Sequence, residues 1–414
     1  MTYSNAIRMN PDRLWARHMA LAKIGPVGET GSCRLALSDE DAAARGLFAE
    51  WCRAAGLTVQ SDRAGNMFAI RPGRDPSRAV VAAGSHLDTQ PHGGRFDGIS
   101  GVLAALEVLE ALNDADVQTD APLAVINWTN EEGVRFAPGL LGSSWFAGQV
   151  EDDVLDNIRA PDGARFADEA ARAGWRGQMR PQDMALDSFF ELHIEQGPIL
   201  ENAGMQVGVV TSVQGLRWLD VAVTGMDGHA GTTPLDMRKD ALLAAAAMLV
   251  ALNQAGLAEG DDARVSVGRL RPATDGPSTI VGTADFVIDI RHPDGDALDR
   301  LQTTCMIICE KIAAEYGCAA GVSRRLAIPP RDFDSDCIAA VQAAADGLGL
   351  RNQKIASGAL HDASNIAAVA PTTMIFVPCR DGISHNIAEY AAPEDLAAGC
   401  EVLLHAMLKR AGQV

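Results

Sequence analysis

Histidine and carboxylate residues recur in this sequence at the ends of short apolar segments. In chain order they are His86, Asp88, Asp97, Glu131, Glu132, His193 and His385. Imidazole nitrogen and carboxylate oxygen, without thiolate, form a ligand set that suits Zn, Mn, Co or Ni. Two such ions about 3.5–4 Å apart can polarise a carbonyl and activate a water molecule together. These residue types therefore predict a metal-dependent hydrolytic centre.

The adjacent glutamates Glu131 and Glu132 support this prediction through their surroundings. On an ordinary surface such a pair would be a solvated acidic patch. Here the pair directly follows the apolar segment 123–128 and precedes Gly133, so we expect at least one carboxylate to be buried. A buried carboxylate requires a partner. No Lys or Arg is adjacent to the pair, which favours a metal cation as that partner.

A single histidine after a strand is usually a hydrogen-bonded structural residue, so the prediction depends on several such residues converging. The segments that read as buried strands are 67–71, 79–83, 123–128, 189–194 and 373–377. With a helix predicted at 101–112, the strand–helix–strand spacing predicts crossover connections and a mainly parallel sheet. Open α/β sheets bind their ligands outside the carboxyl ends of the strands. The histidines and carboxylates should therefore meet at one edge of the sheet.

The pattern changes near residue 210, which predicts a smaller domain inserted into the first. Its expected elements are strands at 207–213 and 218–224, an Ala-rich helix at 240–254, strands at 264–270 and 286–291, and a helix at 295–316. After a Pro-Pro break the helix–strand–helix pattern resumes. We predict an α/β fold whose catalytic domain, 1–211 and 327–414, has a mainly parallel sheet with helices on both faces. A smaller α/β domain at 212–326 interrupts it.

Composition and charge exclude several classes of protein. Of the 414 residues, 47% are hydrophobic and 21% charged, which is ordinary for a globular protein. The formal net charge of −19 would repel phosphate backbones and anionic lipids, so we expect no nucleic-acid partner and no membrane partner. The longest wholly apolar run, 241–252, is too short to span a bilayer, and the N-terminus has no signal-peptide pattern. We expect a soluble, cytoplasmic protein.

The eight cysteines form no Cys-x-x-Cys pair. Cys305 and Cys309 are spaced one helical turn apart, but no nearby histidine completes a tetrahedral site. We therefore interpret the cysteines as reduced thiols and not as metal ligands.

The segments around the candidate residues resemble, in order, the signature motifs of one enzyme family. They read GSHLDTQPHGGRFDG, NWTNEEG, ELHIEQG, HAGTTPLDMRKDA, DIRHPD, SGALHDA and FVPCRDGISHN, and they extend over about residues 80–395. The resemblance is to the amidase, or hydantoinase/carbamoylase, branch of the M20 metallopeptidase superfamily. That branch contains N-carbamoyl-L-amino acid hydrolases, β-ureidopropionases and allantoate amidohydrolases.

The resemblance implies two divalent metal ions per subunit (Zn, Mn, Co or Ni) held by five side chains. Asp97 would bridge the two ions. His86 and His193 would complete one site, and His385 and Glu132 the other. The peptidase branch has a carboxylate at the position of His193, so a histidine there is typical of the amidase branch.

The same resemblance implies catalytic and substrate-binding roles. Glu131 would be the general base, taking a proton from water and returning it to the departing nitrogen. Asp88 would orient the metal-binding histidine two residues before it. His229 would stabilise the oxyanion, and in the family this histidine commonly comes from the partner subunit, so we expect a homodimer whose inserted domain is both lid and interface. Gln196 would contact the ureido group and Arg291 the substrate carboxylate.

Two positions depart from the family pattern, both on the substrate side. Ser278 stands where the family motif Asn-Val-Ile-Pro-Gly has asparagine, and a hydroxyl replaces an amide. Leu360 stands where the family has a glycine that lies against the substrate, which adds bulk and restricts the backbone. The metal-ligand set is intact. We therefore expect these changes to alter the substrate preference more than the reaction.

The main prediction is an enzyme that removes the carbamoyl group of an N-carbamoyl-L-amino acid as carbon dioxide and ammonia. Allantoate and N-carbamoyl-β-alanine are the competing substrates within the branch, and the segments 212–218 and DIRHPD look more like the carbamoyl-amino-acid group. A metal-dependent dipeptidase or aminoacylase is a second alternative, disfavoured by His193. A non-catalytic binding protein on the same fold is the third.

Overall fold

The computed structural model describes residues 7–412. The chain divides into two compact units. The first comprises the described residues through Thr211 and those from Phe333 onward, and the second runs from Ser212 to Asp332. The roles predicted for the two parts of the chain stay predictions.

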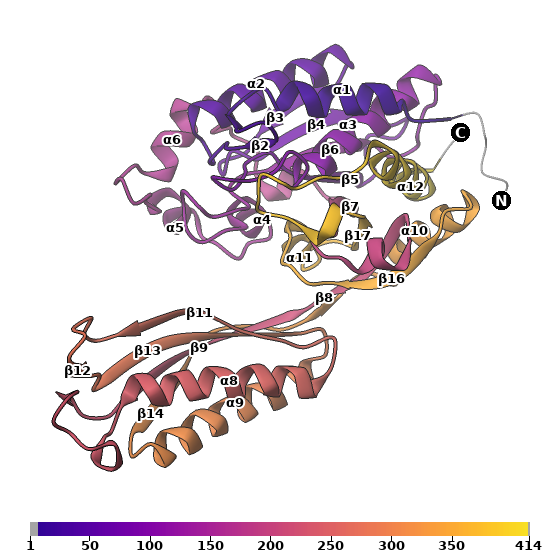
Figure 1. Ribbon diagram of the computed structural model, residues 1–414. Helices are drawn as coiled ribbons and strands as arrows, with labels where there is room; N and C mark the ends of the chain where they lie inside the picture. The colour runs from indigo at the N-terminus through magenta and orange to yellow at the C-terminus, as the bar shows by residue number, and fades with distance from the viewer. Residues whose placement is uncertain (1–6, 413–414) are drawn as a thin grey trace. The chain divides into compact units, whose positions relative to one another are not determined.

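The first unit is built on a mixed sheet whose centre is parallel (Figure 1). The strand order is β8-β17-β7-β5-β6-β4-β3, with β16 also paired to β8; the last two residues of β8 pair with β15, and these residues already belong to the second unit. The bounds are β3 (Thr58–Ser61), β4 (Met67–Arg71), β5 (Val80–His86), β6 (Leu123–Trp128), β7 (Leu186–Ile194), β8 (Val207–Val213), β15 (Arg331–Asp332), β16 (Asn352–Ser357) and β17 (Thr372–Val377). Strands β17, β7, β5 and β6 pair in parallel, whereas β4 and β8 join this group antiparallel. The α/β fold with a parallel central sheet is thus confirmed, with antiparallel strands at its flanks.

Helices cover both faces of this sheet (Figure 1). The helices of the first unit are α1 (Pro11–Leu21), α2 (Asp39–Ala54), α3 (Ile99–Asp114), α4 (Leu141–Phe146), α5 (Asp152–Asn157), α6 (Phe166–Arg172), α7 (Ile199–Ala203), α10 (Ser335–Gly347), α11 (Asp362–Ile366) and α12 (Pro393–Ala411). Phe190 and Leu192 of β7 point into the core that α3 and α12 share. Phe189 lies against Trp128, which in turn contacts Phe146 of α4 on the opposite face. Alternate residues of a strand thus anchor the two helical layers.

Strand β5 lies at a topological switch point of the sheet, where successive strands of the chain are added on opposite sides. The chain leaves β5, passes through α3 and returns as β6 on one side, whereas β7 lies on the other side of β5. Ligand sites of open α/β sheets form outside the carboxyl ends of the strands at such a point. Helix α3 packs closely against strand β7 near this point. A Cβ at Gly101 of α3 would lie only 2.4 Å from the carbonyl oxygen of Leu192.

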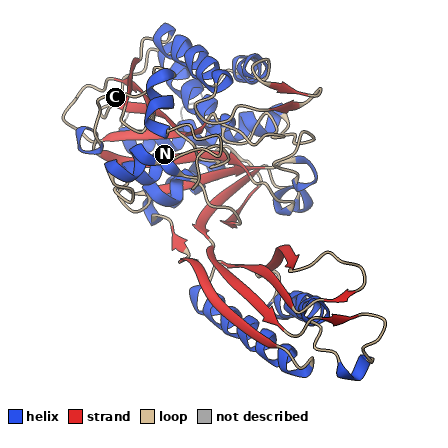
Figure 2. Cartoon of the chain, turned by 90° about the vertical axis from the view of Figure 1, so that its left-hand side faces the viewer, coloured by secondary structure: helices blue, strands red, loops and turns tan. Residues whose placement is uncertain are grey.

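The second unit contains an antiparallel sheet with two helices on one face (Figure 2). The sheet order is β11-β13-β9-β14, with β9 (Gly215–Thr224), β11 (Arg264–Pro272), β13 (Thr283–His292) and β14 (Ala319–Ile328). The helices are α8 (Ala241–Glu259) and α9 (Gly295–Glu315), and a small separate sheet pairs β10 (Gly228–His229) with β12 (Thr279–Ile280).

Helix α8 extends the apolar run noted in the sequence. It is long and apolar enough, by length and composition, to cross a membrane, a test that the core helix of a globular domain also passes. Asp240 caps its N-terminus by accepting hydrogen bonds from the N–H groups of Leu242 and Leu243. One face, including Ala244 and Met248, packs into the core of the second unit. We therefore interpret α8 as a core helix of this unit.

Candidate metal centre

The candidate ligands occupy the segments that follow the parallel strands of the first unit. His86 is the last residue of β5, and His193 is the residue before the end of β7. Glu131 and Glu132 follow β6, and His385 follows β17. Because these strands are parallel, their carboxyl ends lie at the same edge of the sheet.

One carboxylate lies between two groups of ligand atoms. Asp97, in the segment before α3, has Oδ1 3.1 Å from His193 Nε2 and 3.6 Å from His86 Nε2. Its Oδ2 lies 3.2 Å from His385 Nε2, which is 3.6 Å from Glu132 Oε2. Within each group the possible ligand atoms are all within 4.8 Å of one another. The structure thus brings the five predicted ligands together, with a different oxygen of Asp97 facing each group.

The two buried imidazoles are oriented by backbone carbonyls. His86 Nδ1 donates to the carbonyl oxygen of Asp88 and His193 Nδ1 to that of Ile194, each at 2.9 Å. A carbonyl only accepts, so Nδ1 carries a proton in each ring and Nε2 is the nitrogen that faces Asp97. The Gly98 N–H also lies 3.2 Å from His193 Nε2. A ring nitrogen that faces a carboxylate at this distance needs a cation between the two, either a proton or a metal ion.

Burial and charge in this cluster also favour cations. Burial raises the pKa of Glu131 well above its usual range and that of Glu132 to about 7. A hydrogen bond to Asp97 raises the pKa of His385 to about 9. Among the described residues Glu132 Oε1 is buried without a hydrogen-bond partner. Buried carboxylates with an unsatisfied oxygen, beside imidazole nitrogens that face them, fit divalent cations.

Asp88 connects two of the ligand segments. Its Oδ1 accepts a hydrogen bond from the N–H of Glu131, and its Oδ2 one from the N–H of Glu132, both at 3.3 Å. Its backbone carbonyl is the group that contacts His86. Asp88 therefore contacts the histidine through its main chain, while its side chain holds the two glutamates.

Three residues in or beside the ligand segments have an unusual backbone conformation. Asn130, Gln196 and His385 all have a positive φ, between 53° and 59°, although none is glycine. Such conformations cost free energy and persist where the surrounding structure enforces them, often at functional sites. Gly98 has φ +70°, and a Cβ there would lie 2.4 Å from His86 Nε2. Only glycine fits this position without displacing the histidine.

The predicted substrate residues of the first unit lie beside the same centre. Gln196 Nε2 donates to Asp97 Oδ2 and to Ser384 Oγ, each at 3.0 Å. Leu360 is partly buried and directly precedes His361, whose ring centroid lies 4.4 Å from that of His193. Gln196 is thus adjacent to the proposed bridging carboxylate.

Sequence reasoning did not assign several buried polar residues near the centre: Glu191, His361, Asp362 and Glu389. Glu191 and His361 form a further group of possible ligands with His193. Glu191 lies two residues before His193 in the same strand, a spacing that places both on one face. That alternation, and the His-Asp pair within SGALHDA, were the available signals.

His229, Ser278 and Arg291 belong to the second unit. His229 is exposed, and its Nδ1 accepts a hydrogen bond from the Gly231 N–H at 3.0 Å. Ser278 is close to it, because its carbonyl accepts from the N–H of Ala230 at 2.9 Å. Arg291 donates through Nε and one Nη to the two oxygens of Asp289, at 3.0 and 3.1 Å. The parts of these residues in the reaction stay predictions.

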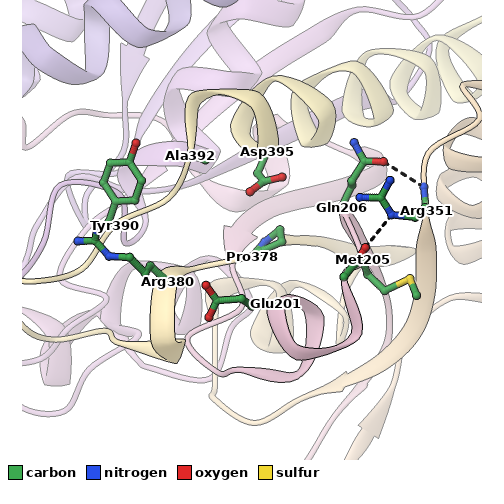
Figure 3. A pocket seen from close by; sticks show the side chains of 10 residues that line it. Glu201, Met205, Gln206, Arg351, Pro378, Arg380, Tyr390, Ala392 and Asp395 are labelled. Atoms are coloured by element: carbon green, nitrogen blue, oxygen red, sulfur yellow. Dashed lines mark hydrogen bonds between the residues drawn. The ribbon is translucent and has the colours of Figure 1, made fainter.

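A separate cavity of about 310 Å³ lies in the first unit (Figure 3). Its lining includes Glu201, Arg351 and Arg380, but none of the candidate metal ligands. The Arg380 guanidinium lies over the ring of Tyr390, and the distance from its carbon to the ring centroid is 4.7 Å. The backbone N–H of Arg380 donates to the backbone carbonyl of Tyr390 at 2.8 Å. These contacts close the base of the loop that carries His385.

The chain is similar to several known proteins along nearly its whole length. The sequence pattern of peptidase family M20/M25/M40 matches residues 82–409. An N-carbamoyl-L-amino-acid amidohydrolase of Rhizobium meliloti is 43% identical over 98% of this chain and 97% of its own length. One from Geobacillus stearothermophilus is 36% identical, over 95% and 97%. The crystal structure of a hydantoinase/carbamoylase family amidase from Burkholderia multivorans has a TM-score of 0.94 and 44% identity, covering 98% of this chain and 99% of that one.

Proposed function

The chain belongs to peptidase family M20/M25/M40, and we propose that it is a metal-dependent amidohydrolase acting on N-carbamoyl-L-amino acids. Water would cleave the bond between the carbamoyl carbon and the amino nitrogen, giving the amino acid and carbamic acid, which breaks down to carbon dioxide and ammonia. The observation that carries the proposal is the position of Asp97, whose two oxygens face two separate groups of ligand atoms.

In this proposal five side chains hold two divalent ions. His86, His193 and one oxygen of Asp97 would hold the first, and His385, Glu132 and the other oxygen the second. When bound, such a pair polarises the substrate carbonyl and makes a water molecule acidic enough to react. The carbonyl partners of His86 and His193 keep Nε2 available as the ligand atom.

Glu131 is the proposed general base. Its Oε2 lies 3.5 Å from His86 Nε2, so it borders the ligand cluster without belonging to either group of ligand atoms. Burial raises its pKa, which makes its carboxylate a better proton acceptor. The carboxylate would take a proton from the attacking water and deliver it to the departing nitrogen.

The predicted substrate residues are found in both units. Gln196 would contact the ureido group and Leu360 would lie against the substrate. Ser278 and His229 belong to the second unit, and His229 would stabilise the oxyanion. Arg291 would bind the substrate carboxylate, as a charge-assisted pair between a guanidinium and a carboxylate is directional and strong. Asp289 already occupies Nε and one Nη of that guanidinium, so it would preset the orientation in which Arg291 meets the substrate.

We further propose a cytoplasmic homodimer. All eight cysteines are free in the structure, as expected of a protein from a reducing compartment. Leu243, Val250 and Leu257 project from α8 with 54–68% of their surface exposed. They recur every seven residues on one side of the helix, which is a suitable surface for a second copy of this unit.

The test is ammonia release from a panel of substrates, with the enzyme loaded separately with Mn, Co, Ni or Zn. The panel holds N-carbamoyl-L-amino acids and their amides, N-carbamoyl-β-alanine, allantoate, N-acyl amino acids and dipeptides, with amino-acid release followed for the last two. We expect turnover of N-carbamoyl-L-amino acids and much slower turnover of their amides. Faster turnover of allantoate, N-carbamoyl-β-alanine or dipeptides would replace the proposed substrate. No turnover with any metal would favour a binding protein.

A further inference from the structure

Glu389 is a buried carboxylate that no predicted role uses. It is 2% exposed and lies in the loop between β17 and α12. Its Oε1 accepts hydrogen bonds from the N–H groups of Phe96 and Asp97, at 3.0 and 3.1 Å. Its Oε2 accepts a hydrogen bond from Ser384 Oγ at 3.0 Å. One carboxylate therefore joins the segment that carries Asp97 to the loop that carries His385.

Glu389 also reaches the Asp97 side chain, through Ser384. Ser384 Oγ lies 3.2 Å from Asp97 Oδ2 and accepts a hydrogen bond from Gln196 Nε2 at 3.0 Å. A hydroxyl has one proton, so Ser384 donates either to Glu389 or to Asp97. Glu389 Oε2 is the nearer acceptor, at 3.0 Å compared with 3.2 Å for Asp97 Oδ2, so the proton points to Glu389. The Asp97 Oδ2 lone pair then stays available to a cation.

The Asp97 segment is shaped to receive this carboxylate. A Cβ at Gly94 would lie 2.1 Å from Glu389 Oε1 and 2.5 Å from Glu389 Cβ, so any other residue would push the glutamate away. Tyr390, the residue after Glu389, contacts Arg380 at the base of the same loop (Figure 3). The close approach at Gly94 and this contact both restrict the position of Glu389.

We propose that Glu389 is a positioning residue of the metal centre, which fixes Asp97 so that its two oxygens face the two groups of ligand atoms. The inference rests on the proposed function, because it assigns Asp97 to two ions. Glu389 itself lies in neither group of ligand atoms and touches Asp97 through backbone N–H groups and through Ser384. Residues that orient metal ligands in this way typically change metal affinity or activity by about 10–100-fold when replaced.

The experiment compares Glu389→Gln with the wild-type chain in three measurements: metal affinity against a chromophoric chelator, metal-saturated kcat and KM, and the thermal unfolding midpoint of the metal-free protein. In the variant the new amide donates to Ser384, whose proton must turn to Asp97 Oδ2 and compete with the metal. We expect metal affinity about 10–100-fold weaker. KM at saturating metal should stay unchanged, and the metal-free midpoint should match that of the control below.

The matched control is Glu195→Gln. Glu195 is also a buried glutamate, 7% exposed, whose carboxylate accepts two backbone hydrogen bonds, from the N–H groups of Ile199 and Leu200 at 2.8 Å. Its hydrogen bonds do not involve Asp97. This variant should lose about as much stability as Glu389→Gln, because both glutamates accept two backbone hydrogen bonds. It should keep its metal affinity within about twofold of the wild type. Equal loss of metal affinity in both variants would reduce Glu389 to a structural residue.

Glu389→Asp keeps the inference testable should Glu389→Gln fail to fold. It keeps the carboxylate but shortens the side chain by one methylene, so one carboxylate can no longer reach the Phe96 and Asp97 N–H groups together with Ser384. It should weaken metal binding without a change in KM. Wild-type affinity in a folded Glu389→Gln, or in Glu389→Asp where Glu389→Gln does not fold, would overturn the inference and leave the proposed function standing. A wild-type chain that bound no divalent metal would instead overturn the proposed function.

Discussion

The side chain of Asp88 accepts a hydrogen bond from the backbone N–H of Glu131, at 3.3 Å. Its other oxygen accepts from the next residue, Glu132, so the segment after β5 fixes the backbone of both glutamates. Held in this way, the two side chains diverge: Glu131 reaches His86, and Glu132 reaches His385. Adjacent residues of one type thereby acquire different surroundings, on which their proposed roles depend.

The first prediction separates these roles. Glu131→Gln should lower kcat by about 10²–10⁴-fold and retain metal, because a general base is lost and no ligand is. Glu132→Gln should lose metal, since its carboxylate lies with Asp97 and His385 in one group of ligand atoms. Elemental analysis and ammonia release on the same samples measure both effects. Loss of metal from Glu131→Gln but not from Glu132→Gln would invert the two roles.

The second prediction concerns metal removal. Dialysis against a chelator should abolish turnover, and an added divalent metal should restore it. Because the large cores of the two units contain none of the five ligands, we expect the metal-free protein to remain folded. Circular dichroism and a cooperative thermal transition measure the fold. Full activity in protein shown to be metal-free would contradict the mechanism.

The third prediction compares two glycines whose φ angles are nearly equal and positive. Gly98 has φ +70° and Gly148 has φ +72°, but a Cβ would meet the ring of His86 at the first and nothing within 4 Å at the second. Gly148→Ala should lower the free energy of unfolding by about 1–2 kcal/mol, because alanine is strained at a positive φ. The Gly148→Ala protein should bind metal normally. Gly98→Ala should cost about 1–3 kcal/mol more and bind metal poorly, because His86 must move.

Denaturant unfolding and metal titration of both glycine variants measure these effects. Equal metal affinity in the two would mean that the position of His86 does not depend on the space at residue 98.

The fourth prediction concerns assembly. If His229 serves the metal centre of a partner subunit, inactive His229→Ala chains mixed with inactive Glu131→Gln chains should regain activity. In a crossed dimer one site receives both intact residues and the other receives neither. Random mixing makes about half of the dimers crossed, so about a quarter of all sites should recover. Ammonia release after verified subunit exchange is the measurement, and no recovery would place His229 in its own chain's site or outside catalysis.

The fifth prediction is a pH dependence of stability caused by a histidine that is not among the proposed metal ligands. His18 is buried, and burial lowers its pKa to about 4. Above pH 6.5 the histidine is neutral in both the folded and the unfolded states. Between pH 6.5 and 4 only the unfolded state takes up the proton, so stability falls as the pH falls. The loss should reach roughly 3 kcal/mol at the low end of this range.

The measurement is urea unfolding of the metal-free protein at pH 7 and pH 4.5, in the wild type and in His18→Gln. The variant lacks the titrating group, so its stability should change less between the two pH values. Parallel changes in both proteins would show that His18 is not the source of the effect.

The sequence alone determined the central strands and the chemical class of the site. The segment 123–128 coincides with β6 because an uninterrupted apolar run is typical of a strand buried on both faces. The predicted strand 79–83 corresponds to β5, which continues to His86. The prediction ended too early because polar residues at the end of a buried strand conceal where the strand stops. The same runs do not reveal strand direction, so the antiparallel flanks β4 and β8 were not predicted.

Only the tertiary structure decided how the candidate residues meet. Residue types and motifs identified Asp97 as a ligand, but which of its oxygens faces which histidine depends on loops that are remote in sequence. The contact of Asp88 with the backbone of two glutamates and the approach of Glu389 to Gly94 also join distant segments. Local patterns encode burial and residue chemistry, whereas such contacts arise when parallel strands bring the ends of separate segments to one edge of a sheet.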